Sequence, residues 1–172
     1  MTENQFWSII EKGKNSKNNS IEINDIVGAE LRTLSASELV QYQKIFHIFF
    51  ENAYTWDLWN ACIIIQSGCG DDSFMDFRAS LISLGKEIYK NTMKDPDFFA
   101  SLDEEKISNR IYNEDFIGLA AYIYEKKTSK DIYDEFDIIA NDEPLGEKLN
   151  FEDENIEEKL RIKYPKLMEK YW

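Results

Sequence analysis

The 172-residue sequence is poor in the residues that mark several classes of protein. It has only seven glycines and three prolines, which excludes collagen-like and low-complexity chains. Its two cysteines are too few for a small scaffold held together by disulfides. No unbroken apolar run approaches the ~20 residues that cross a bilayer, so we expect no membrane-spanning segment.

Metal ligands and nucleophiles are equally scarce. His47, Cys62 and Cys69 form neither a CxxC nor an HxxxH pattern, so we expect no metal site and no cofactor. His47 lies beside core-type aromatic residues, and no turn motif that would carry a nucleophilic Ser or Cys accompanies it. This pattern favours a structural role for His47, and we assign no catalytic residue. The N-terminus lacks the pattern of a signal peptide, which predicts a cytoplasmic protein with reduced thiols.

Positive charge is the third shortage. Lys and Arg together number 20 against 33 Asp and Glu, which gives a net charge of −13. Nucleic-acid binding relies on basic side chains that neutralise phosphates, so we expect no such partner. The same negative field favours a basic protein partner. Residues 131–158 are strongly acidic, and this stretch is either a contact surface or a solvated face.

Apolar and aromatic residues are plentiful, at 43% and 14% of the chain. They recur at the i, i+3, i+4 spacing of amphipathic helices, and no stretch alternates as a strand does. We therefore predict an all-α fold: a single compact multi-helix domain over residues 1–172, with about seven or eight helices. The predicted helices run from a capping box at Thr2 to Gly13 and over about 22–34, 36–53, 56–66, 72–93, 103–112, 114–127 and 155–164. A short helical turn is expected to follow Asp95, and residues 131–151 are expected to form a loop with one helical turn.

Residues 56–66 stand out because apolar side chains occupy almost every face of the predicted helix. A helix of this kind belongs in the centre of a domain, packed on several sides. The β-branched residues 63–65 also suit a strand, but no partner strand lies nearby in the sequence. We predict a central buried helix here, followed by a turn over residues 67–70.

Polar and aromatic side chains gather around that turn. The candidate binding residues are Trp56, Asp57, Trp59, Asp71, Asp72 and Arg78. Asp71 and Asp72 open the next helix, where one of them caps it and the other complements its dipole, or both contact a ligand such as Mg²⁺ or Ca²⁺. Because Asp57 begins an apolar helix and Arg78 is the only basic residue between Lys44 and Lys86, we predict a buried Asp57–Arg78 ion pair that clamps the two helices together.

Several phrases of this region resemble one protein family. They are Trp56-Asp57-Leu58-Trp59, Gly68-Cys69, Asp71-Asp72, Phe77-Arg78 and Asp95-Pro96-Asp97. Together they look like the bacterial family named domain of unknown function 4240. The opening Met1-Thr2-Glu3 and the closing phrase of residues 164–167 extend the resemblance over nearly the whole chain. The resemblance implies an uncharacterised bacterial protein and supplies no reaction.

Two functional hypotheses follow. The first is a non-enzymatic acidic protein that acts through protein–protein contact, with an immunity or antitoxin role as its concrete form. The alternative is an enzyme or sensor that binds a small ligand or a divalent metal ion through residues 56–78. In that case Trp56 and Trp59 would wall a pocket, and the charged candidates would form its rim. Convergence of these side chains in one cleft would favour the alternative.

Overall fold

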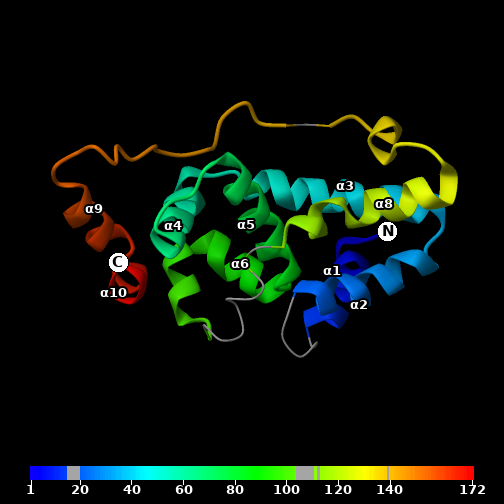
Figure 1. Cartoon of the computed structure of the whole chain (residues 1–172), viewed down its shortest axis with the longest axis horizontal. Coiled ribbons are helices and arrows are strands. Elements are labelled where there is room, and N and C mark those ends of the chain that lie inside the picture. The colour runs from blue at the N-terminus through cyan, green and yellow to red at the C-terminus, as the bar shows by residue number, and fades with distance from the viewer. Residues whose placement is uncertain (15–19, 104–110, 112, 139) are drawn as a thin grey trace.

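A computed structural model describes residues 1–14, 20–103, 111, 113–138 and 140–172 (Figure 1). In these ranges every regular element is a helix, so the predicted all-α fold is confirmed. The α-helices are α1 (Glu3–Lys14), α2 (Ser20–Thr33), α3 (Ala36–Asn52), α4 (Trp56–Gln66), α5 (Asp71–Ser83), α6 (Lys86–Lys94), α8 (Glu114–Thr128), α9 (Ile156–Lys163) and α10 (Pro165–Tyr171), with the 3-10 helices η1 (Pro96–Ser101) and η2 (Ile132–Glu135). These described helices slightly outnumber the predicted seven or eight, while most of the helix predicted over 103–112 lies outside the described residues.

Local capping signals set several helix starts. The backbone N–H of Thr2 donates to Gln5 Oε1 at 2.7 Å, and the N–H of Gln5 donates to Thr2 Oγ1 at 3.3 Å. Ser35 and Glu38 form the same reciprocal capping box at α3. At η1, the Asp95 side chain accepts a hydrogen bond from the backbone N–H of Asp97, and Pro96 occupies the first turn. These three predicted starts are confirmed.

The most enclosed helix is α5, which packs against α1, α3, α4, α6 and α8. Every residue from Phe77 to Ser83 is buried, and three of them are the small residues Ala79, Ser80 and Ser83. Short side chains let neighbouring helices approach α5 from several sides. The prediction that α4 is the central helix is therefore wrong. Helix α4 lies towards the α10 end of the molecule and leaves Trp56 and Ile63 half-buried (Figure 1).

The helix predicted over 72–93 is two helices. Gly85 separates α5 from α6 and has a φ of +98°, a conformation that residues with a Cβ atom rarely adopt. The apolar stripe runs on across the break, with Leu84 buried and Ile88 half-buried. Because the stripe is continuous, the hydrophobic period alone did not show where the first helix ends.

Gly13 does not end its helix, which was the predicted role. Helix α1 continues through it to Lys14. A Cβ atom at Gly13 would lie 2.8 Å from Val27 Cγ2, so the missing side chain is what allows α1 and α2 to pack closely.

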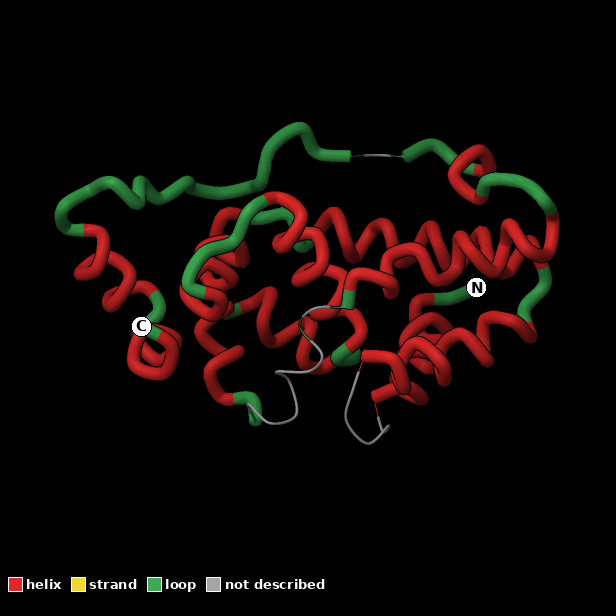
Figure 2. Tube along the Cα trace, in the orientation of Figure 1, coloured by secondary structure: helices red, strands yellow, loops and turns green. Residues whose placement is uncertain are grey.

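The C-terminal part of the chain returns along the molecule. Helix η2 follows α8, and after it an extended segment runs to α9 at the opposite end of the molecule (Figure 2). The predicted loop with a helical turn over 131–151 is confirmed. Helix α10 then docks on α4 and η1. The buried carboxylate of Asp97 accepts the backbone N–H groups of Lys166 at 3.0 Å and Leu167 at 2.8 Å, which fixes the start of α10 against η1.

Candidate functional site

Arg78 is a structural cation in the interior. Its side chain is buried between α3 and α5, with the residue 5% exposed, and Nη1 donates to the carbonyl oxygen of Phe50 at 3.1 Å. The guanidinium carbon lies 3.9 Å from the centre of the Phe50 ring and 4.6 Å from that of Tyr54. Nη1 is also 3.9 Å from a carboxylate oxygen of Glu51. Burial lowers the pKa of Arg78 to about 10, so the group is still charged at neutral pH.

Asp57 has a different partner, so the predicted Asp57–Arg78 clamp is wrong. The Asp57 carboxylate pairs with Lys163 of α9, and both side chains are substantially exposed. Tyr164 donates its hydroxyl to the backbone carbonyl of Asp57 at 3.3 Å. The amide of Asn60 donates to that same hydroxyl at 3.4 Å. Asp57 thus belongs to the contact between α4 and the C-terminal helices.

The aromatic candidates form a stack with one end near Arg78. The Trp56 and Trp59 rings lie 5.1 Å apart, and the Trp59 and Phe74 rings 4.6 Å apart, with both pairs nearly parallel. Phe74 then lies under the Arg78 guanidinium at 5.3 Å. At the other end, the Lys148 ammonium lies 4.7 Å from the centre of the Trp56 ring. The structure therefore brings Trp56, Trp59 and Arg78 into one array that is filled by aromatic rings.

Asp71 and Asp72 are exposed in the first turn of α5. The residue at the N-cap is Gly70, and its position has no side-chain hydrogen bond, so the predicted capping by an aspartate is wrong. The charges of Asp71 and Asp72 complement the positive end of the α5 dipole. One turn later, burial raises the pKa of Asp76, and the nearby charges of Glu114 and Asp72 add to that rise. The Arg78 guanidinium instead faces Glu51 and the rings of Phe50, Tyr54 and Phe74.

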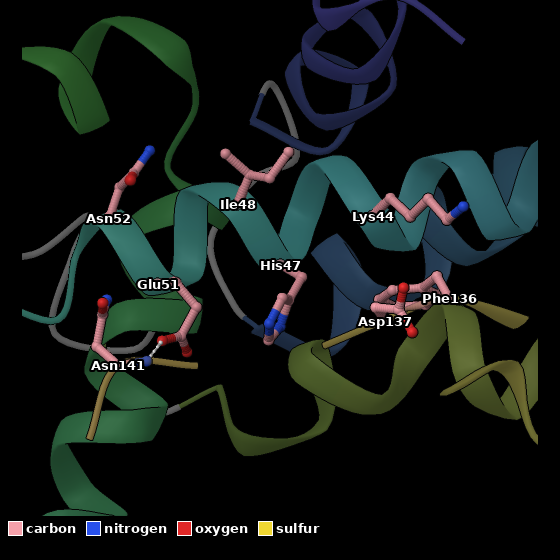
Figure 3. Close-up of a pocket in the computed structure, with 8 residues that line it drawn as sticks. All are labelled: Lys44, His47, Ile48, Glu51, Asn52, Phe136, Asp137 and Asn141. Carbon is pink, nitrogen blue, oxygen red and sulfur yellow. Dashed lines mark hydrogen bonds between the residues drawn. The ribbon is translucent and has the colours of Figure 1, made fainter. Parts of the chain in front are cut away.

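A cleft of about 480 Å³ lies elsewhere, between α3 and the chain that follows η2 (Figure 3). It is lined by Lys44, His47, Ile48, Glu51, Asn52, Phe136, Asp137 and Asn141. His47 and Glu51 project from one side of α3 towards the segment that carries Asn141 (Figure 3). The Phe136 ring lies 6.3 Å from His47 and 5.6 Å from the Lys44 ammonium. The cleft combines an imidazole, an ammonium and two carboxylates with apolar walls.

Glu51 connects this cleft to the interior. One of its oxygens faces Arg78 at 3.9 Å, and the other accepts the backbone N–H of Asn141 at 3.0 Å. The side chain is 15% exposed. Sequence reasoning missed Glu51, although its spacing from Lys44 and His47 places all three along one edge of α3. The opposite wall was beyond such reasoning because it comes from residues about 90 positions later in the chain.

Residues 131–158, called the acidic segment below, carry most of the net negative charge. They contain twelve Asp and Glu against one Lys, which is −11 of the chain's net −13. The segment is fastened to the helices near its middle: Trp56 N–H donates to the Leu145 carbonyl and Leu145 N–H to the Tyr54 carbonyl, both at 2.9 Å. Nearer its start, Glu135 accepts from the Tyr124 hydroxyl at 2.9 Å. Ile138 and Leu145 remain 50% and 58% exposed on it.

Two further classes of site are absent from the described ranges. No cluster of three or more His, Cys, Asp or Glu side chains there is arranged to hold a metal ion. Among the same residues, no helix has both the length and the apolar character needed to span a membrane.

Comparison with protein-family models matches residues 1–126 to the family described as protein of unknown function, DUF4240. The chain belongs to this family. The DUF4240 match begins before α1 and ends within α8, so it includes Arg78, the aromatic stack and the α3 wall of the cleft. The acidic segment and the expected resemblance at residues 164–167 lie beyond the matched residues. No curated protein and no solved structure matches the chain.

Proposed function

We propose that this DUF4240 protein is a non-enzymatic binding protein that holds a basic protein partner on its acidic segment. The observation that carries the proposal is the net charge of −11 on this one segment, while the rest of the chain is close to neutral. A concentrated negative surface accelerates the approach of a basic partner and rejects acidic ones. The segment is also attached to the helices at Leu145 and Glu135, and its backbone runs along one side of the molecule (Figure 1).

Apolar contacts supplement the charges. Exposed ion pairs contribute little affinity individually, so a stable complex needs buried apolar area as well. Ile138 and Leu145 supply exposed apolar side chains within the acidic segment itself. Two of the charged side chains that suggested an alternative site make contacts within the protein, since Arg78 is buried against α3 and Asp57 pairs with Lys163. This distribution supports recognition on the surface over chemistry at residues 56–78.

The concrete form of the proposal is an immunity or antitoxin role in the cytoplasm. In such a role the acidic segment would cover a basic surface of a toxin and block it stoichiometrically. Charge complementarity gives fast capture, which suits a protein that must neutralise its target soon after both are made.

Charge neutralisation tests this proposal. We would replace Asp142→Asn, Glu143→Gln and Glu147→Gln in the acidic segment, all exposed. The matched control removes the same charge elsewhere, with Glu87→Gln, Glu125→Gln and Glu169→Gln, which are also exposed. The parent chain is used to capture a stoichiometric basic protein from lysate of the source cells, and the affinity of the purified pair is then measured.

We expect the neutralised acidic segment to bind about tenfold more weakly, since three exposed charge contacts contribute ~0.5 kcal/mol each. The control variant should bind as the parent does, and affinity should fall as salt increases. Failure to capture any stoichiometric protein at low or moderate salt would contradict the proposal. So would equal losses in the two variants.

A second candidate function is small-ligand binding, as a sensor or enzyme, in the cleft beside α3. The specific observation in its favour is the grouping of Lys44, His47, Glu51 and Asp137 around about 480 Å³. Calorimetry and thermal unfolding against Mg²⁺, Ca²⁺, Mn²⁺ and nucleotides test it. A ligand of the cleft should raise the melting temperature of the parent and not that of His47→Ala. No heat and no thermal shift across the panel would remove this candidate.

A further inference from the structure

The Trp56 ring contacts a lysine of the acidic segment. The Lys148 ammonium lies 4.7 Å from the centre of that ring, at the end of the aromatic stack opposite Arg78. The backbone of Leu145 forms two hydrogen bonds, to Trp56 and to the residue two positions before it, which hold this part of the segment against α4. The chain then passes through Gly146, whose φ of +95° suits a residue without a Cβ atom. The segment is therefore held in place where its lysine meets the ring.

Lys148 is the only basic residue among the twelve carboxylates of the acidic segment. Among the described residues its ammonium forms no ion pair, and it lies against an aromatic face instead. Such a face attracts a cation electrostatically, and the indole of tryptophan does so most strongly. Because Lys148 is exposed, a cation from solution can take its place without disturbing the helices. The fold thus shows where this acidic surface accepts a cation.

The aromatic stack supports the Trp56 ring from below. Trp59 stacks on Trp56 with an interplanar angle of 15°, and Phe74 continues the stack at 4.6 Å. The Trp59 indole N–H donates to the Cys69 carbonyl at 2.9 Å, which fixes the middle ring. Trp56 itself is half-buried at the start of α4, so part of its surface is supported and the rest reaches solvent. Preorganised tryptophans of this kind are typical anchors at protein interfaces.

A second exposed contact between a lysine and a ring lies in the opposite electrostatic setting. The Lys126 ammonium lies 5.2 Å from the centre of the Tyr122 ring on α8. Arg32 and Lys127 line the same pocket, so a further cation would be repelled there. Trp56, in contrast, contacts the segment that carries a net charge of −11. The field of the protein therefore directs a positive side chain to Trp56 and away from Tyr122.

We propose that the Trp56 ring anchors an arginine or lysine side chain of the basic partner, which displaces Lys148. This inference rests on the proposed function and names the place where the acidic segment binds its partner most specifically. Lys148 then acts as an internal competitor, because the ring must release it before the partner's cation can stack. The carboxylates attract the partner, and the ring supplies the directional contact. Removal of Lys148 should therefore strengthen binding, and removal of the ring should weaken it.

NMR titration of the full chain with a basic peptide tests the proposal. The probe is a short unstructured peptide that alternates arginine with serine, and the control peptide carries neutral citrulline in place of arginine. At low salt, we expect the arginine peptide to shift the indole N–H signal of Trp56 and the side-chain signals of Lys148. The indole signal of Trp7, which is 2% exposed, should not move. The citrulline peptide should leave all of these signals unchanged.

Matched variants add a measurement of affinity by calorimetry. Trp56→Leu should bind the arginine peptide about two- to fivefold more weakly, which is the effect of one exposed cation–π contact, whereas Tyr122→Leu should bind it as the parent does. Lys148→Met should bind it more tightly, and Lys126→Met, which removes the same charge from the Tyr122 ring, should change the affinity less. The gain from Lys148→Met should be smaller in the Trp56→Leu background, because a freed ring contributes only where the ring is present.

The results distinguish the anchor from the proposed function. If the peptide binds the parent and Trp56→Leu equally, and the Trp56 signal does not move, the anchor is wrong while the acidic segment still binds cations. If the peptide does not bind the parent at low salt, the anchor and the proposed function are both contradicted. Should Trp56→Leu not fold, the parent and Lys148→Met still decide. An unmoved Trp56 signal, or a Lys148→Met affinity no higher than that of the parent, would then overturn the proposal.

Discussion

Replacing Arg78 with alanine should destabilise the protein strongly, because the guanidinium fills the space between α3 and α5. The change removes the donor to the Phe50 carbonyl and the cation stacked 3.9 Å from the Phe50 ring. It also leaves Glu51, 15% exposed, without the positive charge that it now faces. A cavity remains where the side chain was, since Arg78 itself is 5% exposed.

The size of the effect follows from these losses. A hydrogen bond from a charged group contributes ~1.5–3 kcal/mol, and a desolvated cation–π contact about 2 kcal/mol. Relief of the desolvation that lowers the pKa of Arg78 offsets part of this sum. We therefore expect a net loss of about 3–5 kcal/mol, as for other broken buried charge contacts. In a chain of this size that lowers the melting temperature by roughly 6–20 °C.

Urea unfolding and calorimetry measure this loss, with Arg161→Ala as the matched control. Arg161 pairs with Glu157 one turn away on the surface of α9, so its removal should cost below about 0.5 kcal/mol. Double-mutant cycles should show coupling between Arg78 and Glu51, and additivity between Arg78 and Asp57. The reasoning is refuted if Arg78→Ala costs no more than the control.

Three further changes probe other parts of the molecule. Asp97→Ala should cost about 1.5–3 kcal/mol and expose α10 to proteolysis, because the backbone N–H groups of Lys166 and Leu167 lose a charged acceptor; an unchanged urea midpoint would contradict this. Gly85→Ala forces a Cβ atom into a φ of +98° and should cost about 1–2 kcal/mol by thermal unfolding, whereas Gly118→Ala, inside α8, should not destabilise. The raised pKa of Asp76 favours the folded state below its ordinary pKa of 3.8, and this contribution is lost as pH rises through the folded pKa. Asp76→Asn should thus be more stable than the parent at neutral pH, with the difference closing in acid; a pH-independent difference would show that the charge is not the cause.

Local patterns account for the features that could be predicted. The capping boxes at Thr2 and Ser35 depend on residues three positions apart, and the amphipathic stripes depend on spacings of three and four. Both kinds of signal lie within one or two turns of helix, so they can be read along the chain. Residues 56–66, for the same reason, were predicted as a helix with the bounds that α4 has.

The candidate site was predicted only in part. Trp56 and Trp59 meet because they are three positions apart on one helix, and Phe74 extends their stack to Arg78. The cleft beside α3 was missed, since three of its eight lining residues come from the chain after η2. No local period links those two segments.

By itself, then, the sequence determined the helical class, most helix bounds, the family and the acidity of residues 131–158. Tertiary structure alone decided which charges pair: Arg78 with the end of α3, and Asp57 with Lys163, which is 106 residues away. It also decided that α5, with its small residues, is the enclosed helix instead of the more apolar α4. The physical reason is that hydrophobicity along a helix specifies which face is buried, whereas ion pairs and central packing depend on how closely distant helices can approach.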